Sequence, residues 1–244
     1  MEGDEVDWRL KVTTTVAEDT VLPWNGHEVK KGDRIKVVSV VDLPKKRTLT
    51  LPVPSLTALY ISNSEKSWKK YWAIRKERKI DTSLKKNITF KDDKESFDAL
   101  ELIATSIISA FTAIEAFCND SIPEDHEYWH NKKSDLILEK SDKKEIERFI
   151  SIEKKLNIIL PTIYSVESPK GKSPVWVSYK KLKECRDSLI HAKSHETRSV
   201  DTGKTNLWDK LFKIQSPYLL AKDIFDWYLK DKEKVPQWYT RFPK

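Results

Sequence analysis

The sequence predicts an α+β protein, with a mainly α-helical bundle preceded by a small N-terminal β unit. The first 62 residues are rich in β-branched side chains that partly alternate with polar ones, a pattern typical of short strands. Residues 97–118 form the most apolar stretch of the chain, and their apolar side chains recur at helical spacing. We therefore expect three parts: a β-rich unit at residues 1–62, a basic helical connector at 63–91, and a helical domain at 92–244.

The N-terminal unit is expected to hold four or five strands. Residues 7–16, 33–41 and 45–51 have strand-like composition, and a proline-rich stretch leads to a further apolar run at residues 56–61. An Asn25-Gly26 pair and the Pro44-Lys45-Lys46 sequence indicate turns between strands. These features predict a small sheet or partial barrel. Substrate recruitment, partner docking and structural extension all remain open as its role.

The connector carries the positive charge of the chain. Residues 63–91 hold ten Lys or Arg and three Asp or Glu, whereas acids and bases balance in the rest of the sequence. A helix is predicted from Ser67 to Lys79, with aromatic side chains on one side. We expect these aromatic residues to pack on the body of the protein, although stacking on nucleobases is an alternative. The basic residues favour a polyanionic partner such as RNA. The candidate RNA-binding residues are Lys69, Lys70, Arg75 and Lys76.

The predicted helical domain contains a carboxylate on the apolar face of a helix. On a helical wheel Glu115 falls near the centre of the apolar face of the helix at residues 97–118, in line with Phe97 and Ile108. A buried carboxylate needs a cation, a cluster of donors or a raised pKa. Further helices are predicted at residues 142–160, around 180–191, and at 206–229, where Pro217 should kink or break the chain.

A later helix carries an arginine next to its apolar face, which could balance the charge of this carboxylate. In the helix around residues 180–191, Arg186 lies at the margin of the apolar face, and an unpaired guanidinium is prohibitive to bury. We expect Glu115 and Arg186 to pair across packed helices. The apolar face holds Leu182, Cys185 and Leu189, and the polar face holds Lys180, Lys183, Asp187 and His191. A structural ion pair beside a surface histidine is the simpler alternative for this motif.

These residues resemble a known family. The helix that reads Ala-Ile-Glu-Ala-Phe-Cys-Asn, ending at Asn119, and the later Arg186-Asp187-Ser188-Leu189-Ile190-His191 are similar to the HEPN superfamily (higher eukaryotes and prokaryotes nucleotide-binding). The resemblance covers roughly residues 92–232. Many HEPN proteins are ribonucleases of toxin–antitoxin, abortive-infection and CRISPR-type immune systems.

The resemblance implies a homodimer in which two Arg/His pairs face one cleft and cleave RNA without a metal, by attack of the ribose 2′-hydroxyl on the adjacent phosphate. His191 would be the acid/base group, Arg186 the phosphate clamp, Asp187 its polar partner and Glu115 a supporting residue. Some family members carry a modifiable Tyr two residues after the His, where this chain has Lys193. An antitoxin or defence-complex partner is implied. A non-catalytic module that binds nucleotide or RNA, or only dimerises, is the second functional hypothesis.

Composition argues against several other classes. The two cysteines lie on predicted core faces, which favours reduced structural thiols in a cytoplasmic protein. Acidic residues interrupt the apolar run at 97–118, so we expect no membrane span. No Gly-rich phosphate loop, serine-hydrolase motif or paired-histidine zinc motif occurs, and no cofactor is expected. His126 and His130 could hold a metal, but we favour a polar loop because no third ligand is evident.

Overall fold

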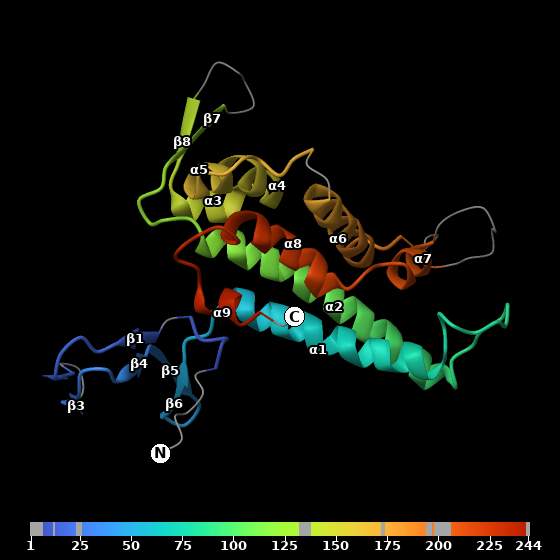
Figure 1. Cartoon of the computed structure of the whole chain (residues 1–244), viewed down its shortest axis with the longest axis horizontal. Helices are drawn as coiled ribbons and strands as arrows, with labels where there is room; N and C mark the ends of the chain where they lie inside the picture. Colours follow the sequence, from blue (N-terminus) through green and yellow to red (C-terminus); the bar gives the residue numbers. More distant parts are fainter. Residues whose placement is uncertain are drawn as a thin grey trace. The chain divides into compact units, whose positions relative to one another are not determined.

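The computed structural model describes residues 7–11, 13–22, 26–131, 138–171, 174–193, 197 and 206–242. It divides into two compact units (Figure 1). Unit 1 comprises Met1–Leu59 and Glu233–Lys244, and unit 2 comprises Tyr60–Lys232. The described residues form both α-helices and short antiparallel strands, so the predicted α+β class is confirmed.

The described residues of unit 1 form six short strands, paired into three separate two-stranded antiparallel ladders. Strand β1 (Thr13–Thr15) pairs with β4 (Arg34–Lys36), β2 (Thr20–Val21) with β3 (Glu28–Val29), and β5 (Val38–Leu43) with β6 (Arg47–Pro52). A small core of Val16, Leu22 and Val29 lies beneath the first four strands, with Ile35 packed on it. The predicted β unit is confirmed, but the described residues form no single sheet or barrel.

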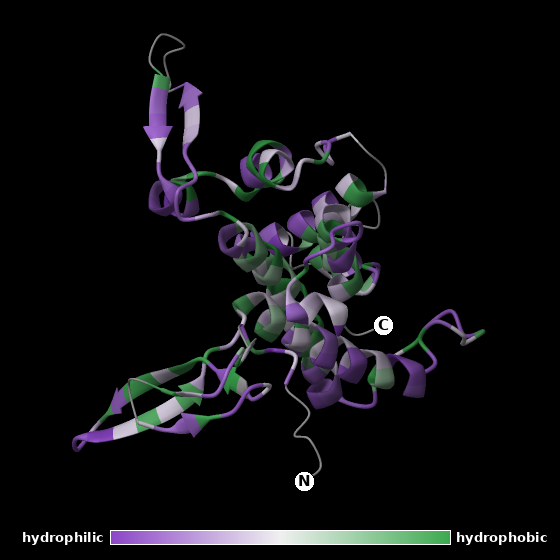
Figure 2. Ribbon diagram, turned by 60° about the vertical axis from the view of Figure 1, so that its left-hand side comes forward, coloured by the Kyte–Doolittle hydropathy of each residue, from purple (hydrophilic) through white to green (hydrophobic). Residues whose placement is uncertain are grey.

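The β5–β6 hairpin turns at Pro44-Lys45-Lys46, as predicted. Lys45 and Lys46 have φ of 64° and 55°, a left-handed conformation that closes short hairpin loops. Most side chains of both strands are exposed, and Figure 2 shows apolar bands along the strands of this unit. The C-terminal residues of unit 1 form the short helix α9 (Gln237–Thr240).

Helix α1 (Leu56–Glu77) begins earlier than the sequence suggested. Residues 56–61 are its first turns and not a further strand, so the boundary placed at residue 62 falls inside this helix. The Ser55 hydroxyl accepts a hydrogen bond from the Ala58 backbone N–H at 3.3 Å, which caps the helix. A six-residue apolar run fits a strand or a buried helical turn equally well, and only the Ser55 cap decides between them.

Unit 2 is built around α2 (Asp93–Asp120), α6 (Val175–Ile190) and α8 (Pro217–Leu229), which pack against one another. Asp92 caps α2 by accepting a hydrogen bond from the Glu95 N–H at 2.8 Å. The core is rich in aromatic side chains, with Phe117 against Phe225 and Tyr228 at ring-centre distances of 5.1 and 5.9 Å. Pro217 begins α8 and separates it from α7 (Leu207–Phe212), as the sequence predicted.

The segment predicted as one helix over residues 142–160 is divided. It contains α3 (Lys143–Phe149), α4 (Ile152–Lys154), a π-helical turn η1 (Lys155–Ile159) and α5 (Leu160–Tyr164). Pro161 lies within the first turn of α5, where its missing N–H is tolerated, and does not end the helix. A hairpin of β7 (Tyr128–Asn131) and β8 (Leu138–Ser141) precedes α3 (Figures 1 and 2).

Helix α2 is long and apolar enough to cross a membrane by length and composition. Half of its most apolar 18-residue window is buried inside the fold. Ile103, Ile107 and Ile114 of this helix have no exposed surface. The core helix of a globular domain has the same properties, so the finding is only weak evidence for a membrane span.

Candidate functional site

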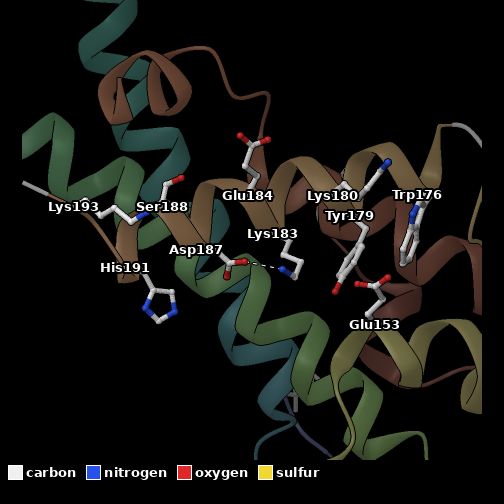
Figure 3. A pocket seen from close by; sticks show the side chains of 10 residues that line it. All are labelled: Glu153, Trp176, Tyr179, Lys180, Lys183, Glu184, Asp187, Ser188, His191 and Lys193. Atoms are coloured by element: carbon white, nitrogen blue, oxygen red, sulfur yellow. Dashed lines mark hydrogen bonds and ion pairs between the residues drawn. The ribbon is translucent and has the colours of Figure 1, made fainter. Parts of the chain in front are cut away.

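A cavity of about 510 Å³ lies along the polar face of α6, at the Arg-Asp-x-x-x-His motif (Figure 3). Asp187 and His191 both line it, and Lys183 lies one turn before Asp187. The Lys183 ammonium donates a hydrogen bond to the Asp187 carboxylate at 2.7 Å. The cavity is lined by Glu153, Trp176, Tyr179, Lys180, Lys183, Glu184, Asp187, Ser188, His191 and Lys193.

The helical period explains why these side chains share one face. Residues three or four apart along a helix are neighbours on its surface, which brings Tyr179, Lys183, Asp187 and His191 into one row. The opposite face of α6 buries Leu182 and Cys185 and so fixes the rotation of the helix. Helix α6 ends at Ile190, and the backbone N–H of His191 donates to the Asp187 carbonyl at 2.9 Å. The exposed His191 side chain therefore projects from the end of the helix (Figure 3).

Arg186 lies beside the cavity, not on its lining. Its Nη1 is 2.8 Å from the Asp187 carboxylate, and its guanidinium carbon lies 4.0 Å from the centre of the Phe111 ring. Its Nε is buried and has no hydrogen-bond partner among the described residues. The Arg186 side chain as a whole is 22% exposed. Asp187 thus connects the arginine behind the cavity to the lysine within it.

The predicted pairing of Glu115 with Arg186 is wrong. Glu115 is exposed, and so are Phe97 at 62% and Ile108 at 40%, the two residues with which it aligns. The buried side of α2 contains Ile103, Ile107 and Ile114. The apolar face predicted from the sequence therefore lies partly in the core, since it includes Ile107 and Ile114, and its exposed edge carries Glu115 with Phe97 and Ile108. The cation Arg186 is balanced by its neighbour Asp187 and by the aromatic face of Phe111.

Tyr179 and Glu153 were missed by the sequence analysis. Tyr179 stacks on Trp176 with ring centres 4.7 Å apart, and on Phe111 at 6.2 Å. Its hydroxyl is buried without a hydrogen-bond partner, and burial, reinforced by the charge of Glu153, raises the pKa of Tyr179 above its usual range. Figure 3 shows the hydroxyl beside the Glu153 carboxylate. Tyr179 could have been found from its spacing to Lys183, whereas Glu153 comes from α4 and has no signal in the sequence.

The candidate RNA-binding residues of α1 differ in their surroundings. Lys70 and Lys76 are exposed, and Lys69 is ion-paired with Glu65 at 2.6 Å but remains 65% exposed. Arg75 is only 14% exposed. Its guanidinium donates to the Asp81 carboxylate at 2.7 Å, the Tyr71 hydroxyl at 2.8 Å and the Phe212 carbonyl at 2.7 Å. Arg75 is therefore a structural residue of unit 2, whatever else it contacts.

A second titratable cluster lies away from the cavity. The Lys155 side chain is 1% exposed, and its ammonium donates to Asn119 Oδ1 at 2.8 Å and to the Glu147 carbonyl at 2.9 Å. Burial lowers the pKa of Lys155 below its usual range.

Burial raises the pKa of the Cys118 thiol to about 12 and that of Cys185 to about 11. Both thiols are free and buried, as the sequence predicted.

Among the described residues there is no group of His, Cys, Asp and Glu side chains arranged to hold a metal ion. His130 instead contacts the Ser141 hydroxyl at 3.0 Å and stacks on Tyr128. Comparison of the chain with protein-family models, with curated proteins and with solved structures finds no match. The interpretation of the site therefore depends on its own geometry and chemistry.

Proposed function

We propose that this chain is a HEPN-type, metal-independent endoribonuclease that acts in a toxin, abortive-infection or antiviral defence system. One observation carries the proposal: His191 and Asp187 open onto the same cavity as three lysines, with Arg186 ion-paired to Asp187 beside it. An imidazole is suited to proton transfer, and cations around it are suited to binding a phosphate. Lys180, Lys183 and Lys193, which the motif itself does not include, lie on the cavity lining.

In the proposed reaction, an imidazole removes the proton of the ribose 2′-hydroxyl as that oxygen attacks the adjacent phosphorus. The bond between phosphorus and the 5′-oxygen of the next nucleotide then breaks, and a protonated group donates a proton to the departing oxygen. The products are a 2′,3′-cyclic phosphate and a 5′-hydroxyl. Lys183, Lys193 and Arg186 stabilise the charge that develops on the phosphoryl oxygens.

Among the described residues of one chain, His191 is the histidine that lines this cavity, whereas the reaction needs a base and an acid. In the proposed homodimer, a second copy of the chain supplies the second imidazole across an isologous interface. Asp187 holds Arg186 and Lys183 at fixed positions, so that the cations need little rearrangement when the phosphate binds.

The engagement of Arg186 favours a second candidate function. A guanidinium that is ion-paired, packed on Phe111 and mostly covered has a sufficient structural role without catalysis. In that case the chain would be a non-catalytic HEPN-like module that binds RNA or nucleotide, or only dimerises. The two candidates differ in what they require of His191, since a structural or binding role has no need of its proton transfer.

The deciding experiment incubates the purified protein with total RNA in EDTA. Wild type is compared with His191→Ala and with His27→Ala, a control that removes an exposed histidine of unit 1. We expect cleavage that yields 2′,3′-cyclic phosphate ends, a loss of about a hundredfold or more in His191→Ala, and no loss in the control. A strict requirement for a divalent ion, or full activity of His191→Ala, would refute the mechanism.

A second pair of variants tests whether Lys183 or Arg186 binds the phosphate. Lys183→Ala removes a charge from the cavity lining, and Arg186→Ala removes the charge beside it. If Arg186 clamps the phosphate, its loss lowers the rate in protein whose thermal melt shows that it is folded. If Arg186→Ala cleaves normally while Lys183→Ala does not, the lysine is the clamp and the arginine is structural.

A further inference from the structure

A second cavity, of about 510 Å³, lies in unit 2 between α1 and the segment that joins α7 to α8. Two tryptophans and Arg75 of α1 form one wall, and backbone and side chains of the connecting segment form the other. The lining residues are Trp68, Trp72, Arg75, Phe212, Lys213, Ile214, Gln215 and Ser216. It shares no residue with the His191 cavity.

Trp72 presents an aromatic surface to this cavity. Its side chain is 46% exposed, although Trp68 and Tyr71 on the same helix are buried. It stacks on Trp68 with ring centres 5.9 Å apart and an angle of 21° between the planes. Because Trp68 is itself held in the core, the exposed ring is fixed in orientation before any ligand arrives. We expected the aromatic residues of this helix, Trp68, Tyr71 and Trp72, to pack on the body of the protein. This is correct for Trp68 and Tyr71 but not for Trp72.

Arg75 adds a rigid cation to the same wall. Its guanidinium carbon lies 5.6 Å from the centre of the Trp72 ring, and hydrogen bonds to Asp81, Tyr71 and Phe212 hold it there. Asp81 balances part of its charge at 2.5 Å. A second cation on the lining, Lys213, is 76% exposed and lies 3.9 Å from Asp209, which leaves its ammonium able to reach a ligand.

Ser216 supplies the polar group of the cavity. Its hydroxyl oxygen is buried and has no hydrogen-bond partner among the described residues. It stands at the N-cap of α8 yet forms no side-chain capping bond to the helix. A buried hydroxyl without a partner is uncommon, because its desolvation is not compensated. Rotation of the Ser216 side chain toward a ligand in the cavity would satisfy it.

We propose that this cavity binds a nucleobase. The flat base stacks on Trp72, Lys213 contacts the attached phosphate, and rotation of the Ser216 side chain brings its hydroxyl to the polar edge of the base. Tryptophan platforms beside cations bind bases of any sequence, because every base has a π face. The neighbouring basic residues of α1, including the exposed Lys76, favour a base that belongs to a polyanion over an uncharged aromatic ligand.

The site deepens the proposed function, on which its assignment to RNA rests. Helix α7 touches the surroundings of both cavities. Phe212 lines the cavity at Trp72, while Lys210 contacts Glu184 at 2.9 Å and Ser188 at 3.4 Å, two residues that line the His191 cavity. A single RNA strand that follows α7 would stack a base on Trp72 and bring a phosphate to His191.

The test measures binding with RNA that cannot be cleaved, so that its result is independent of catalysis. Fluorescence anisotropy follows a labelled single-stranded 2′-O-methyl RNA, an abasic strand of equal length and charge, and labelled AMP. The variants are Trp72→Ala, Trp72→Phe and the control Trp129→Ala. Trp129 is 55% exposed and also lies beside a cation, Lys140, but belongs to the β7–β8 hairpin.

We expect Trp72→Ala to weaken binding of the base-containing strand on the order of tenfold, the effect of one lost stacked base. Trp72→Phe should keep most of the affinity, and Trp129→Ala all of it. The abasic strand should bind more weakly and be insensitive to Trp72. Equal losses for the abasic strand, or no loss in Trp72→Ala, would overturn the proposal.

The AMP arm identifies the source of the base. Binding of AMP that depends on Trp72 indicates a free-nucleotide site, and Trp72-dependent binding of the strand alone indicates RNA; either supports a nucleobase site. Failure of the ribonuclease proposal has a separate signature, since cleavage would be absent or independent of His191 while this binding persists.

Discussion

The Arg186 guanidinium lies 4.0 Å above the centre of the Phe111 ring, and this contact joins α6 to α2 at the candidate site. Phe111 is 2% exposed, so the cation faces an aromatic surface that water does not reach. Attraction between a desolvated cation and an aromatic face is worth about 2 kcal/mol, compared with about 0.5–1 kcal/mol at an exposed site. The motif arginine therefore contributes to helix packing as well as to the charge of the cavity.

A double-mutant cycle tests this contact. We expect Arg186→Met and Phe111→Leu to show a coupling of about 1–2 kcal/mol in the free energy of unfolding, measured by urea denaturation. The control is the Arg148–Phe149 pair, whose guanidinium and ring are 5.2 Å apart but whose phenylalanine is 70% exposed. Its coupling should stay below about 0.5 kcal/mol. Equal coupling in the two pairs would show that burial of the ring adds nothing.

The partner of Arg186 can be identified by stability as well. Glu115→Ala should change the free energy of unfolding by no more than about 0.5 kcal/mol, because the side chain is exposed. Asp187→Asn should destabilise the protein by about 1–3 kcal/mol, since it removes the carboxylate from a partly buried guanidinium. Thermal or urea unfolding of the two variants distinguishes them. If Glu115→Ala destabilised the protein more than Asp187→Asn, Glu115 would be the partner of Arg186 after all.

Features of the fold and the site that depend on a single helix could be predicted from the sequence. The row of Lys183, Asp187 and His191 follows from the helical period of α6, and the burial of Leu182 and Cys185 follows from the same wheel. The break at Pro217 was also predictable, because proline cannot continue a helix from within. These features depend on local rules alone.

The sequence was insufficient where partners come from elsewhere in the chain. Phe111 under Arg186, and Glu153 beside Tyr179, are contacts between separate helices. The exposure of Trp72 depends on where α7 ends and α8 begins, which no local rule fixes.

The exposure of Glu115 is a different case, because the wheel places it beside Glu101 and Thr105, which are also exposed, as well as beside Phe97 and Ile108. Those polar neighbours were a local signal for its exposure.

Lys155 predicts an unusual dependence of stability on pH. Its folded-state pKa is lowered by burial, whereas an unfolded lysine titrates at roughly 10.4. Between these two values the unfolded chain binds more protons, so the free energy of unfolding contributed by Lys155 rises with pH. Relative to Lys155→Met, wild type should become more stable as pH is raised toward about 10. Urea denaturation of both proteins at several pH values gives this difference, and a constant difference would contradict the lowered pKa.

The two thiols predict low reactivity. Burial raises the pKa of Cys118 to about 12 and that of Cys185 to about 11, so both remain protonated thiols at neutral pH. Since the thiolate is the reactive form, neither should react with a chromogenic disulfide reagent in the native protein near pH 8, and both should react in guanidinium chloride. Rapid native labelling of either thiol would indicate local opening of the core. Cys118→Ala and Cys185→Ala identify which thiol reacts.

The basic face of α1 predicts the salt dependence of RNA binding. Lys69, Lys70 and Lys76 are exposed, so we expect a triple Lys→Gln variant to bind the non-cleavable RNA more weakly and with a shallower salt slope. Each phosphate contact contributes about 0.7 to the slope for a single strand, so the loss should approach 2 if all three lysines engage.

Arg75 is left out of that variant because its bonds to Asp81, Tyr71 and Phe212 hold unit 2 together, and its loss would confuse affinity with stability. A matched control replaces Lys31, Lys45 and Lys46, three exposed lysines of unit 1, and so changes the net charge equally. Anisotropy titrations across a range of salt concentrations should show the effect only in the α1 variant. Equal slopes in both variants would reduce the basic face of α1 to a contribution from net charge, because the position of the lysines would then make no difference.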